Sequence, residues 1–260
     1  MIVELFGPPG VGKTTLARAL TARLNERGRG VELALSYRPS EYPLASRANG
    51  LTRLLTPVAL RRLARPIVES FAAAGHSAGS CEAYATAELM RLLAPRNVAW
   101  SLRLRQYMLR LSRTRRRATL AGDIVLFDQG FVQAVYTFAL LARAVDRERI
   151  GLALDAMPEP DLLVRLDAPL QVLEARLVER RRCQGRIERL FDLDVETSLG
   201  SMWIFDEMRE LLRARDRPVI CVSSVDRRSL GDCVKKVNEI IVRSRAKALP
   251  QSSEKQDGIG

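Results

Sequence analysis

The first residues that could do chemistry form the segment GPPGVGKTT, which begins at Gly7. The segment fits the pattern GxxxxGK[ST] without a mismatch, and in such loops backbone N–H groups curl around phosphate oxygens. Lys13 is expected to reach the β- and γ-phosphates of a nucleotide, and the Thr14 hydroxyl is expected to coordinate Mg²⁺. The pattern therefore predicts a site for ATP and Mg²⁺ formed by Gly7, Pro8, Pro9, Gly10, Val11, Gly12, Lys13, Thr14 and Thr15.

An acidic residue at the end of a neighbouring apolar strand usually completes the magnesium site of such a loop. Asp128, which closes the run IVLFD, is the acid that we favour for this role and for catalysis. Asp167, which closes LLVRLD, is the competitor. Because Asp167 precedes Pro169, its side chain could instead cap the following helix.

Arginines gather in the segment EARLVERRRCQGRIERLF. On a helix Arg176 and Arg180 share a face, and Arg186 lies beyond Gln184-Gly185, where the chain can bend. A solvated helix is one interpretation of this run. The other is a mobile lid over residues 176–190, whose guanidinium groups would close over a transferring phosphoryl group and stabilise its oxygens.

Five short apolar runs are expected to position these residues as buried strands. They are IVELF (2–6), VELALS (31–36), DIVLFD (123–128), PDLLVRLD (160–167) and RPVICVSS (217–224). Helical patterns separate them, and strands alternating with helices favour a parallel sheet covered on both faces. The sequence therefore predicts an α/β fold, in which a five-stranded parallel sheet forms the middle of three layers.

The helical patterns also define the domain organisation. The helix after the loop repeats leucine every four residues and ends near Gly28, and the last helix is expected to be capped by Ser229. Residues 37–120, between the second and third strands, form a helical region that we expect to face an acceptor molecule. We expect one domain over residues 1–245 and a disordered tail over 246–260.

Composition narrows the classes of function. A net charge of +12 is compatible with nucleic acid, anionic membrane or phosphorylated ligands. The four cysteines form no CxxC pair and His76 is the single histidine, so we expect neither a disulfide framework nor a Cys/His zinc site. No apolar run has transmembrane length, and Glu4 interrupts the apolar run at the N-terminus. We therefore expect a cytoplasmic protein that does not enter the membrane.

Taken together, the motifs resemble the P-loop nucleoside and nucleotide kinases, and thymidylate kinases in particular. The similar segments are GPPGVGKTT, VLFDQGF, PDLLVRLDAPLQVLEAR, GRIERLF and RPVICVSSVDRRSLGDCV. The resemblance implies a P-loop NTPase fold, with Asp128 touching the acceptor or the metal's water shell and Arg176, Arg180 and Arg186 in the lid. It also implies that Arg105, or alternatively Arg103, contacts the acceptor's phosphate.

Two segments depart from the pattern of that family. Gln129 and Gly130 follow Asp128, where thymidylate kinases have an arginine, so a cation expected near the phosphates or the acceptor is missing. The segment SYRPSEYP keeps a proline like the REP segment of the family but has different neighbours, and its Arg38 is expected to contact the acceptor. Residues 37–97 have no clear counterpart.

We therefore expect a phosphotransferase that moves the γ-phosphate of ATP to a small molecule or a nucleotide. One alternative is a nucleotide-dependent switch or ATPase without a small-molecule acceptor. A third is nucleic-acid binding or 5′-end phosphorylation, suggested by the run RLSRTRRR (110–117). We do not favour it, because aromatic residues for base stacking do not accompany that run. The sequence leaves the oligomeric state open, a homodimer included.

Overall fold

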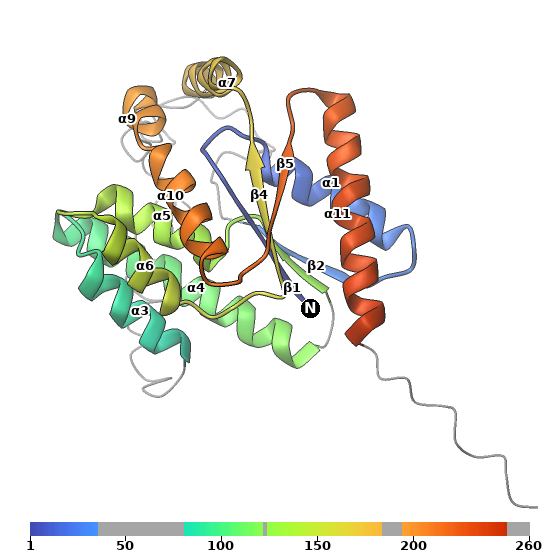
Figure 1. Ribbon diagram of the computed structural model, residues 1–260, viewed down its shortest axis with the longest axis horizontal. Coiled ribbons are helices and arrows are strands. Elements are labelled where there is room, and N and C mark those ends of the chain that lie inside the picture. The colour runs from blue at the N-terminus through green and yellow to red at the C-terminus, as the bar shows by residue number, and fades with distance from the viewer. Residues whose placement is uncertain (36–80, 122–123, 184–193, 249–260) are drawn as a thin grey trace, which may run out of the picture.

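The computed structural model describes residues 1–35, 81–121, 124–183 and 194–248 (Figure 1). Five parallel strands form one sheet in the order β2-β3-β1-β4-β5. The strands are β1 (Ile2–Phe6), β2 (Val31–Ala34), β3 (Ile124–Phe127), β4 (Leu162–Asp167) and β5 (Val219–Ser223). All five predicted strands are therefore confirmed, with ends that differ by no more than two residues.

Helices cover both faces of this sheet, which confirms the predicted three-layer α/β fold (Figure 1). One face packs against α1 (Lys13–Asn25) and α11 (Arg227–Ala248). The other face packs against the layer that contains α3 (Cys81–Leu92), α4 (Val98–Ala121), α5 (Phe131–Leu141), α6 (Arg147–Asp155) and α10 (Trp203–Arg213). The helices α7 (Leu170–Cys183) and α9 (Val195–Gly200) lie beyond the carboxyl end of β4.

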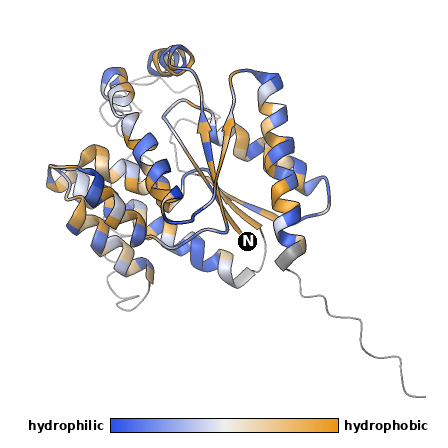
Figure 2. Ribbon diagram, in the orientation of Figure 1, coloured by the Kyte–Doolittle hydropathy of each residue, from blue (hydrophilic) through white to orange (hydrophobic). Residues whose placement is uncertain are grey.

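Alternating strand residues build the two cores. In β1, Val3 and Leu5 pack on the α1/α11 side, whereas Ile2 and Phe6 pack on the α5/α10 side. Because both faces are buried, the strands are apolar almost throughout (Figure 2). The phosphate-loop segment that follows β1 therefore leaves the middle strand of a sheet that is fixed on both sides.

The helical region expected over residues 37–120, between the second and third strands, contains α3 and α4, and its residues 37–80 lie outside the described ranges. The sequence did not single out α5. Nearly all of its residues are buried, Gln133 among them, so the helix has no polar stripe to reveal the helical period.

The start of α11 differs from the prediction. The helix begins at Arg227, and the Asp226 carboxylate accepts a hydrogen bond from the Ser229 N–H at 2.8 Å, so Asp226 is the cap and Ser229 is not. The Ser229 hydroxyl in turn accepts from the Asp226 N–H at 2.9 Å. This reciprocal pair is a capping box, in which Ser229 takes the third helical position. At its other end α11 runs past residue 245 to Ala248.

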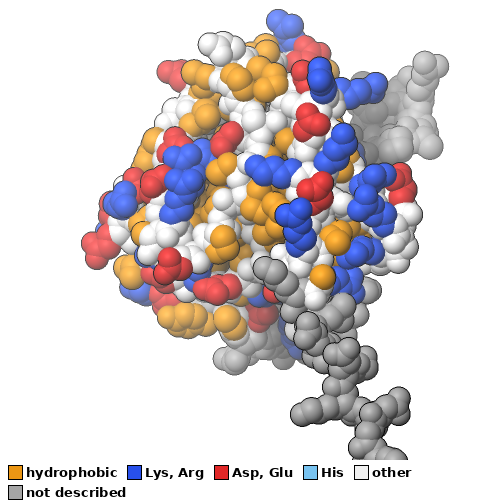
Figure 3. All heavy atoms as spheres, turned by 45° about the vertical axis from the view of Figure 1, so that its right-hand side comes forward, with side chains coloured by type: hydrophobic (Ala, Val, Ile, Leu, Met, Phe, Trp, Pro, Cys, Tyr) orange, Lys and Arg blue, Asp and Glu red, His pale blue; other side chains and the backbone are white. Residues whose placement is uncertain are grey.

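The surface is charged and mixed. Figure 3 shows Lys and Arg side chains interspersed with Asp and Glu side chains over one face of the molecule. Within the described ranges, no helix has the length and the apolar content that a membrane span requires.

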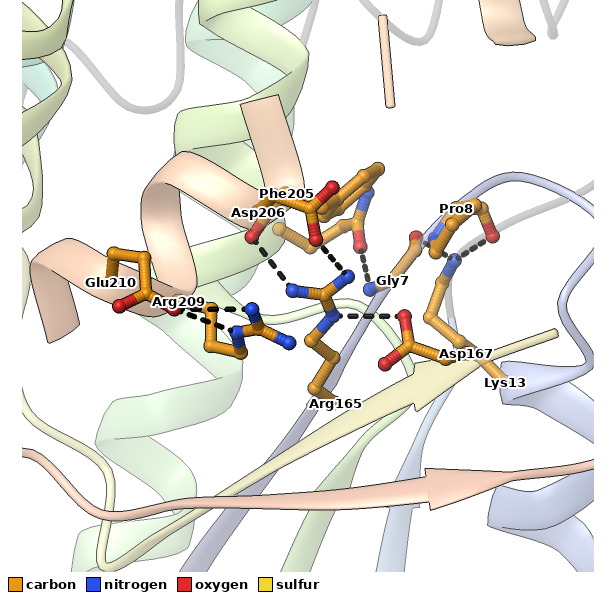
Figure 4. Close-up of polar contacts among 10 residues, drawn as sticks. Gly7, Pro8, Lys13, Arg165, Asp167, Phe205, Asp206, Arg209 and Glu210 are labelled. Carbon is orange, nitrogen blue, oxygen red and sulfur yellow. Dashed lines mark hydrogen bonds and ion pairs between the residues drawn. The ribbon is translucent and has the colours of Figure 1, made fainter. Parts of the chain in front are cut away.

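Arg165 is a charged residue inside the buried strand β4, with 4% of its surface exposed. Its Nε donates to the Asp167 carboxylate at 2.9 Å, its Nη1 to the Phe205 carbonyl at 3.1 Å and its Nη2 to the Asp206 carboxylate at 2.8 Å (Figure 4). Phe205 and Asp206 belong to the first turn of α10. The guanidinium group therefore ties β4 to the beginning of α10.

The substitution Arg165→Met is expected to lower the free energy of unfolding by about 2 kcal/mol in urea titrations, because three hydrogen bonds of a buried group are lost. The loss is not larger because the side chains of Asp167 and Asp206 are 36% and 61% exposed and can be hydrated instead. As a matched control, Arg209 pairs with its exposed neighbour Glu210, and Arg209→Met is expected to change the free energy by less than about 0.5 kcal/mol. Equal effects of the two substitutions would contradict this role of Arg165.

Candidate functional site

The phosphate-loop segment Gly7–Thr14 connects β1 to α1, as the sequence predicts. Gly7, Gly10 and Gly12 have φ values of 146°, 81° and 102°, a region that residues with a Cβ rarely adopt. Gly12 is the N-cap of α1, no side chain caps the helix, and its first turn contains no acidic residue. The N–H groups and the positive end of α1 therefore point to the place where the motif expects phosphate.

Lys13 lies within this loop rather than extending into solvent. Its side chain is buried, and Nζ donates to the Gly7 carbonyl at 2.6 Å and to the Pro8 carbonyl at 2.9 Å (Figure 4). The ammonium group is thus held at the loop by the loop's own backbone. A phosphate chain bound there would meet a cation that is already in place.

Thr14 and Asp128 come together at the beginning of α1. The Thr14 hydroxyl donates to the Asp128 carboxylate at 3.0 Å, and Asp128 is completely buried directly after β3. A hydroxyl and a carboxylate are the hard oxygen ligands that Mg²⁺ prefers. Within the described ranges no three Asp, Glu, His or Cys side chains gather as a metal site. The two residues therefore fit a Mg²⁺ ion that takes its other ligands from phosphate oxygens and water, as such ions usually do.

The competing acid, Asp167, makes a different contact. Its carboxylate accepts from Arg165 at the end of β4, the strand on the opposite side of β1 from β3. The structure thus places Asp128, and not Asp167, against Thr14.

Two buried polar residues that sequence reasoning missed join α5 to β1 and to the phosphate loop. The Gln133 side chain accepts from the Gly7 N–H at 3.0 Å, and the Glu4 carboxylate accepts from the Val132 N–H at 3.1 Å. Glu4 is fully buried in the middle of β1. The sequence analysis used Glu4 only as an interruption of an apolar run. A lone carboxylate in a buried strand just before a phosphate loop is the signal that could have identified it.

Burial dominates the electrostatics of Glu4 and raises its pKa from 4.5 to about 7. The N–H groups of Val132 and Phe131 and the charge of Arg115 act in the opposite direction. The nearby Tyr107 hydroxyl donates to the Gly130 carbonyl at 3.5 Å. Burial, and then the charges of Asp128 and Glu4, raise the pKa of Tyr107, so this phenol remains protonated.

Arg176 and Arg180 lie on one face of α7, but Arg176 does not extend into an open site. Its Nη1 donates to the Val11 carbonyl at 3.2 Å, and its Nη2 donates to the Val225 carbonyl at 2.8 Å. Arg176 thereby connects the phosphate loop to the segment between β5 and α11. Its predicted role on a phosphoryl group requires it to leave these carbonyls. The third lid arginine, Arg186, lies outside the described residues, as does Arg38.

On α4 the structure separates the two arginines considered for the acceptor. Tyr107 faces Gly130, next to Asp128. Arg105 precedes Tyr107 by two residues, which turns it about 200° away on a helix, and it is exposed. Arg103 precedes Tyr107 by four residues and shares its face, with its guanidinium 5.1 Å from the centre of the Trp100 ring. A contact between either arginine and an acceptor remains a prediction.

The chain is similar to several known proteins. The family described as ATPase family associated with various cellular activities (AAA) matches residues 3–47, which include most of β1, the phosphate loop and α1. The chain is 30% identical over 193 residues to a thymidylate kinase of Pseudomonas entomophila (strain L48), over 73% of this chain and 72% of that protein. It is 29% identical over 224 residues to a thymidylate kinase of Pseudomonas putida (strain W619), over 84% of each protein. Among solved structures, a deoxyadenosine kinase from M. mycoides with bound dATP has a TM-score of 0.48 and 14% identity, over 92% of this chain and 100% of that chain.

The raised pKa of Glu4 predicts how stability depends on pH. The folded protein binds a proton at Glu4 more tightly than the unfolded chain, so this carboxyl's contribution is fully present below pH 4.5 and is lost as the pH rises through about 7. The loss amounts to about 3 kcal/mol in the free energy of unfolding. The amide oxygen of Glu4→Gln can still accept from Val132, but the side chain does not titrate. In urea titrations between pH 5 and 8 we therefore expect the free energy of unfolding of Glu4→Gln to fall less than that of the native protein. An identical decline in both proteins would contradict the assignment.

Proposed function

The chain belongs to the thymidylate kinase family, and from that premise we propose that it is an ATP-dependent nucleotide kinase whose acceptor is a nucleoside 5′-monophosphate. ATP would bind along Gly7–Thr15, and the acceptor would bind beside Asp128, at the carboxyl ends of β3 and β1. A cytoplasmic location, where ATP is available, is part of the same proposal.

The observation that carries this proposal is the contact between Thr14 and Asp128. It joins the phosphate loop of β1 to the acid that follows β3, at 3.0 Å, although the two residues are 114 positions apart in the chain. Parallel α/β sheets bind their ligands at the carboxyl ends of the strands, and this contact lies at that edge.

Positioning and charge account for most of the chemistry in phosphoryl transfer, because the reaction needs little covalent participation by the protein. The N–H groups of the loop and of the first turn of α1 would hold the phosphate oxygens of ATP. Lys13 would redirect ammonium hydrogens from the Gly7 and Pro8 carbonyls to the β- and γ-phosphates. Gln133 would keep the loop's first N–H group, that of Gly7, in place.

Thr14 and Asp128 are the residues that would hold Mg²⁺. When bound, such an ion would supply positive charge that offsets the negative charge developing on the phosphate oxygens. The Thr14 hydroxyl and the Asp128 carboxylate, which contact one another at 3.0 Å, would hold the ion, and Asp128 could also orient the acceptor.

The second role of Asp128 depends on the acceptor. A phosphate acceptor needs no general base, so with a nucleoside monophosphate Asp128 would orient substrate and metal. A hydroxyl acceptor must lose a proton, and Asp128 would then accept it. In either case Arg176, Arg180 and Arg186 are proposed to exclude water and favour transfer over hydrolysis.

An acceptor panel tests the proposal. ADP formation is measured with ATP and Mg²⁺ in the presence of thymidine monophosphate, thymidine, deoxyadenosine monophosphate, deoxyadenosine or a 5′-hydroxyl oligonucleotide. We expect a nucleoside monophosphate to stimulate ADP formation most strongly. Steady hydrolysis that no acceptor changes would instead favour a switch or ATPase, and stimulation by the oligonucleotide would favour a 5′-end kinase.

Asp128→Asn is expected to reduce turnover by about 100-fold while the affinity for ATP, measured by calorimetry, changes by less than about threefold. The amide keeps the shape of the side chain but loses the charge that orients metal and acceptor. Asp167→Asn is the comparison, because Asp167 contacts Arg165 rather than Thr14. Full activity of Asp128→Asn, or a larger loss in Asp167→Asn, would remove Asp128 from its proposed role.

A further inference from the structure

Two hydrogen bonds run in opposite directions between β1 and the first turn of α5. From the helix, the Val132 N–H donates to Glu4 at 3.1 Å; from the loop, the Gly7 N–H donates to Gln133 at 3.0 Å. We call these four residues the β1–α5 clamp. Both accepting side chains are buried, Glu4 at 0% and Gln133 at 5% exposure.

Glu4 takes the place of a helix cap for α5. The N-cap residue, Gly130, has no side chain with which to cap, and the first turn contains no acidic residue. The Glu4 carboxylate reaches this helix end from a different element and accepts one of its free N–H groups. A negative charge there also interacts favourably with the positive end of the helix.

Gly130 and Glu4 are fitted closely to one another. A Cβ atom on Gly130 would overlap with the carboxyl carbon of Glu4. The φ value of Gly130 is −101°, which any residue can adopt, so space rather than backbone conformation requires glycine. Gly130, two residues after Asp128, therefore packs directly on the carboxyl group of Glu4.

Burial of the Glu4 carboxyl group is costly for the fold alone. Its Oε1 is buried without a hydrogen-bond partner, as is Nη1 of Arg115, the cation that acts on it. Its neighbours on the same face of β1, Ile2 and Phe6, are apolar. An apolar side chain of similar volume would fill this position without the desolvation of a carboxylate. A buried carboxyl group retained at such a cost beside a ligand loop suggests a functional constraint.

We propose that Glu4 is a positioning residue for phosphoryl transfer, which fixes Asp128 relative to Thr14 and Lys13 through the first turn of α5. The inference rests on the proposed function, because the geometry that it protects is that of the phosphate loop and its acid. Glu4 precedes Gly7 by three residues, and Asp128 precedes Val132 by four, so the clamp joins two short, stiff segments. If the Val132 bond is lost, the start of α5 can move, and Asp128 moves with it relative to Thr14. Misplacement of a catalytic group by about 1 Å is enough to reduce turnover strongly.

The test compares Glu4→Met with Glu4→Gln. The two side chains are similar in volume, but only the glutamine can accept from Val132. Turnover is measured with the most active acceptor of the panel and divided by the number of ATP-binding sites found by calorimetry. We expect Glu4→Met to lose at least about tenfold in turnover per site and Glu4→Gln to stay within about threefold of the native protein.

A merely structural role would give a different result. Val135→Ala, which removes buried methyl groups from the same helix away from the clamp, is the control for destabilisation. This control should lower the melting temperature while leaving turnover per ATP-binding site unchanged. If Glu4→Met behaves like Val135→Ala, with full turnover per site, the positioning role is wrong.

A second measurement does not depend on transfer. We expect Mg²⁺ to strengthen ATP binding at this site. The Mg²⁺ concentration that gives half of this effect reports on the geometry of Thr14 and Asp128. We expect Glu4→Met to raise this Mg²⁺ concentration by about threefold or more, and we expect Glu4→Gln and Val135→Ala to leave it unchanged. If the native protein transfers phosphate to no acceptor, the proposed function fails, and this measurement alone decides on Glu4. An unchanged Mg²⁺ dependence in Glu4→Met would then overturn the inference.

Discussion

The hydrogen bond from the Gly7 N–H to the Gln133 side chain is the constraint on which the geometry of the site depends, because it sets where the phosphate loop leaves β1. The loop is then fixed at three further points. Lys13 binds the Gly7 and Pro8 carbonyls, Arg176 binds the Val11 carbonyl, and Thr14 binds Asp128. A loop held in this way presents its N–H groups without a large reorganisation when phosphate arrives, and such preorganisation makes an electrostatic site effective.

The same physical device occurs twice on the α5/α10 side of the sheet. Glu4 in β1 binds the first turn of α5, and Arg165 in β4 binds the first turn of α10. The two strands are neighbours, and the other strand residues that pack into this core are apolar, among them Ile2, Phe6 and Leu163. Apolar packing is not directional, whereas a hydrogen bond holds a helix end at one place. The buried polar side chains therefore position the first turns of α5 and α10, and the apolar contacts hold the layers together.

The sequence predicted the parts of this molecule that depend on local patterns. Apolar runs predicted the five strands, the GxxxxGK[ST] pattern predicted the loop, and the position of Asp128 after an apolar run predicted the acid that contacts Thr14. The partners of Glu4, Gln133 and Arg165 could not be predicted in this way. Glu4 and Val132 are 128 positions apart, and Arg165 and Asp206 are 41 apart, so only the folded sheet brings them together. The helix α5 lacked a signal because burial on all sides removes the amphipathic period.

Every role proposed for this site requires that the loop binds a triphosphate, with Lys13 neutralising its outer end. Isothermal titration calorimetry of the full chain with ATP and Mg²⁺ measures this binding, with Lys13→Met as the comparison. We expect saturable binding at one site per chain, weakened by about tenfold or more in Lys13→Met because a charge-assisted contact is lost. No heat of binding with well-folded protein, or equal affinity of the two proteins, would contradict it.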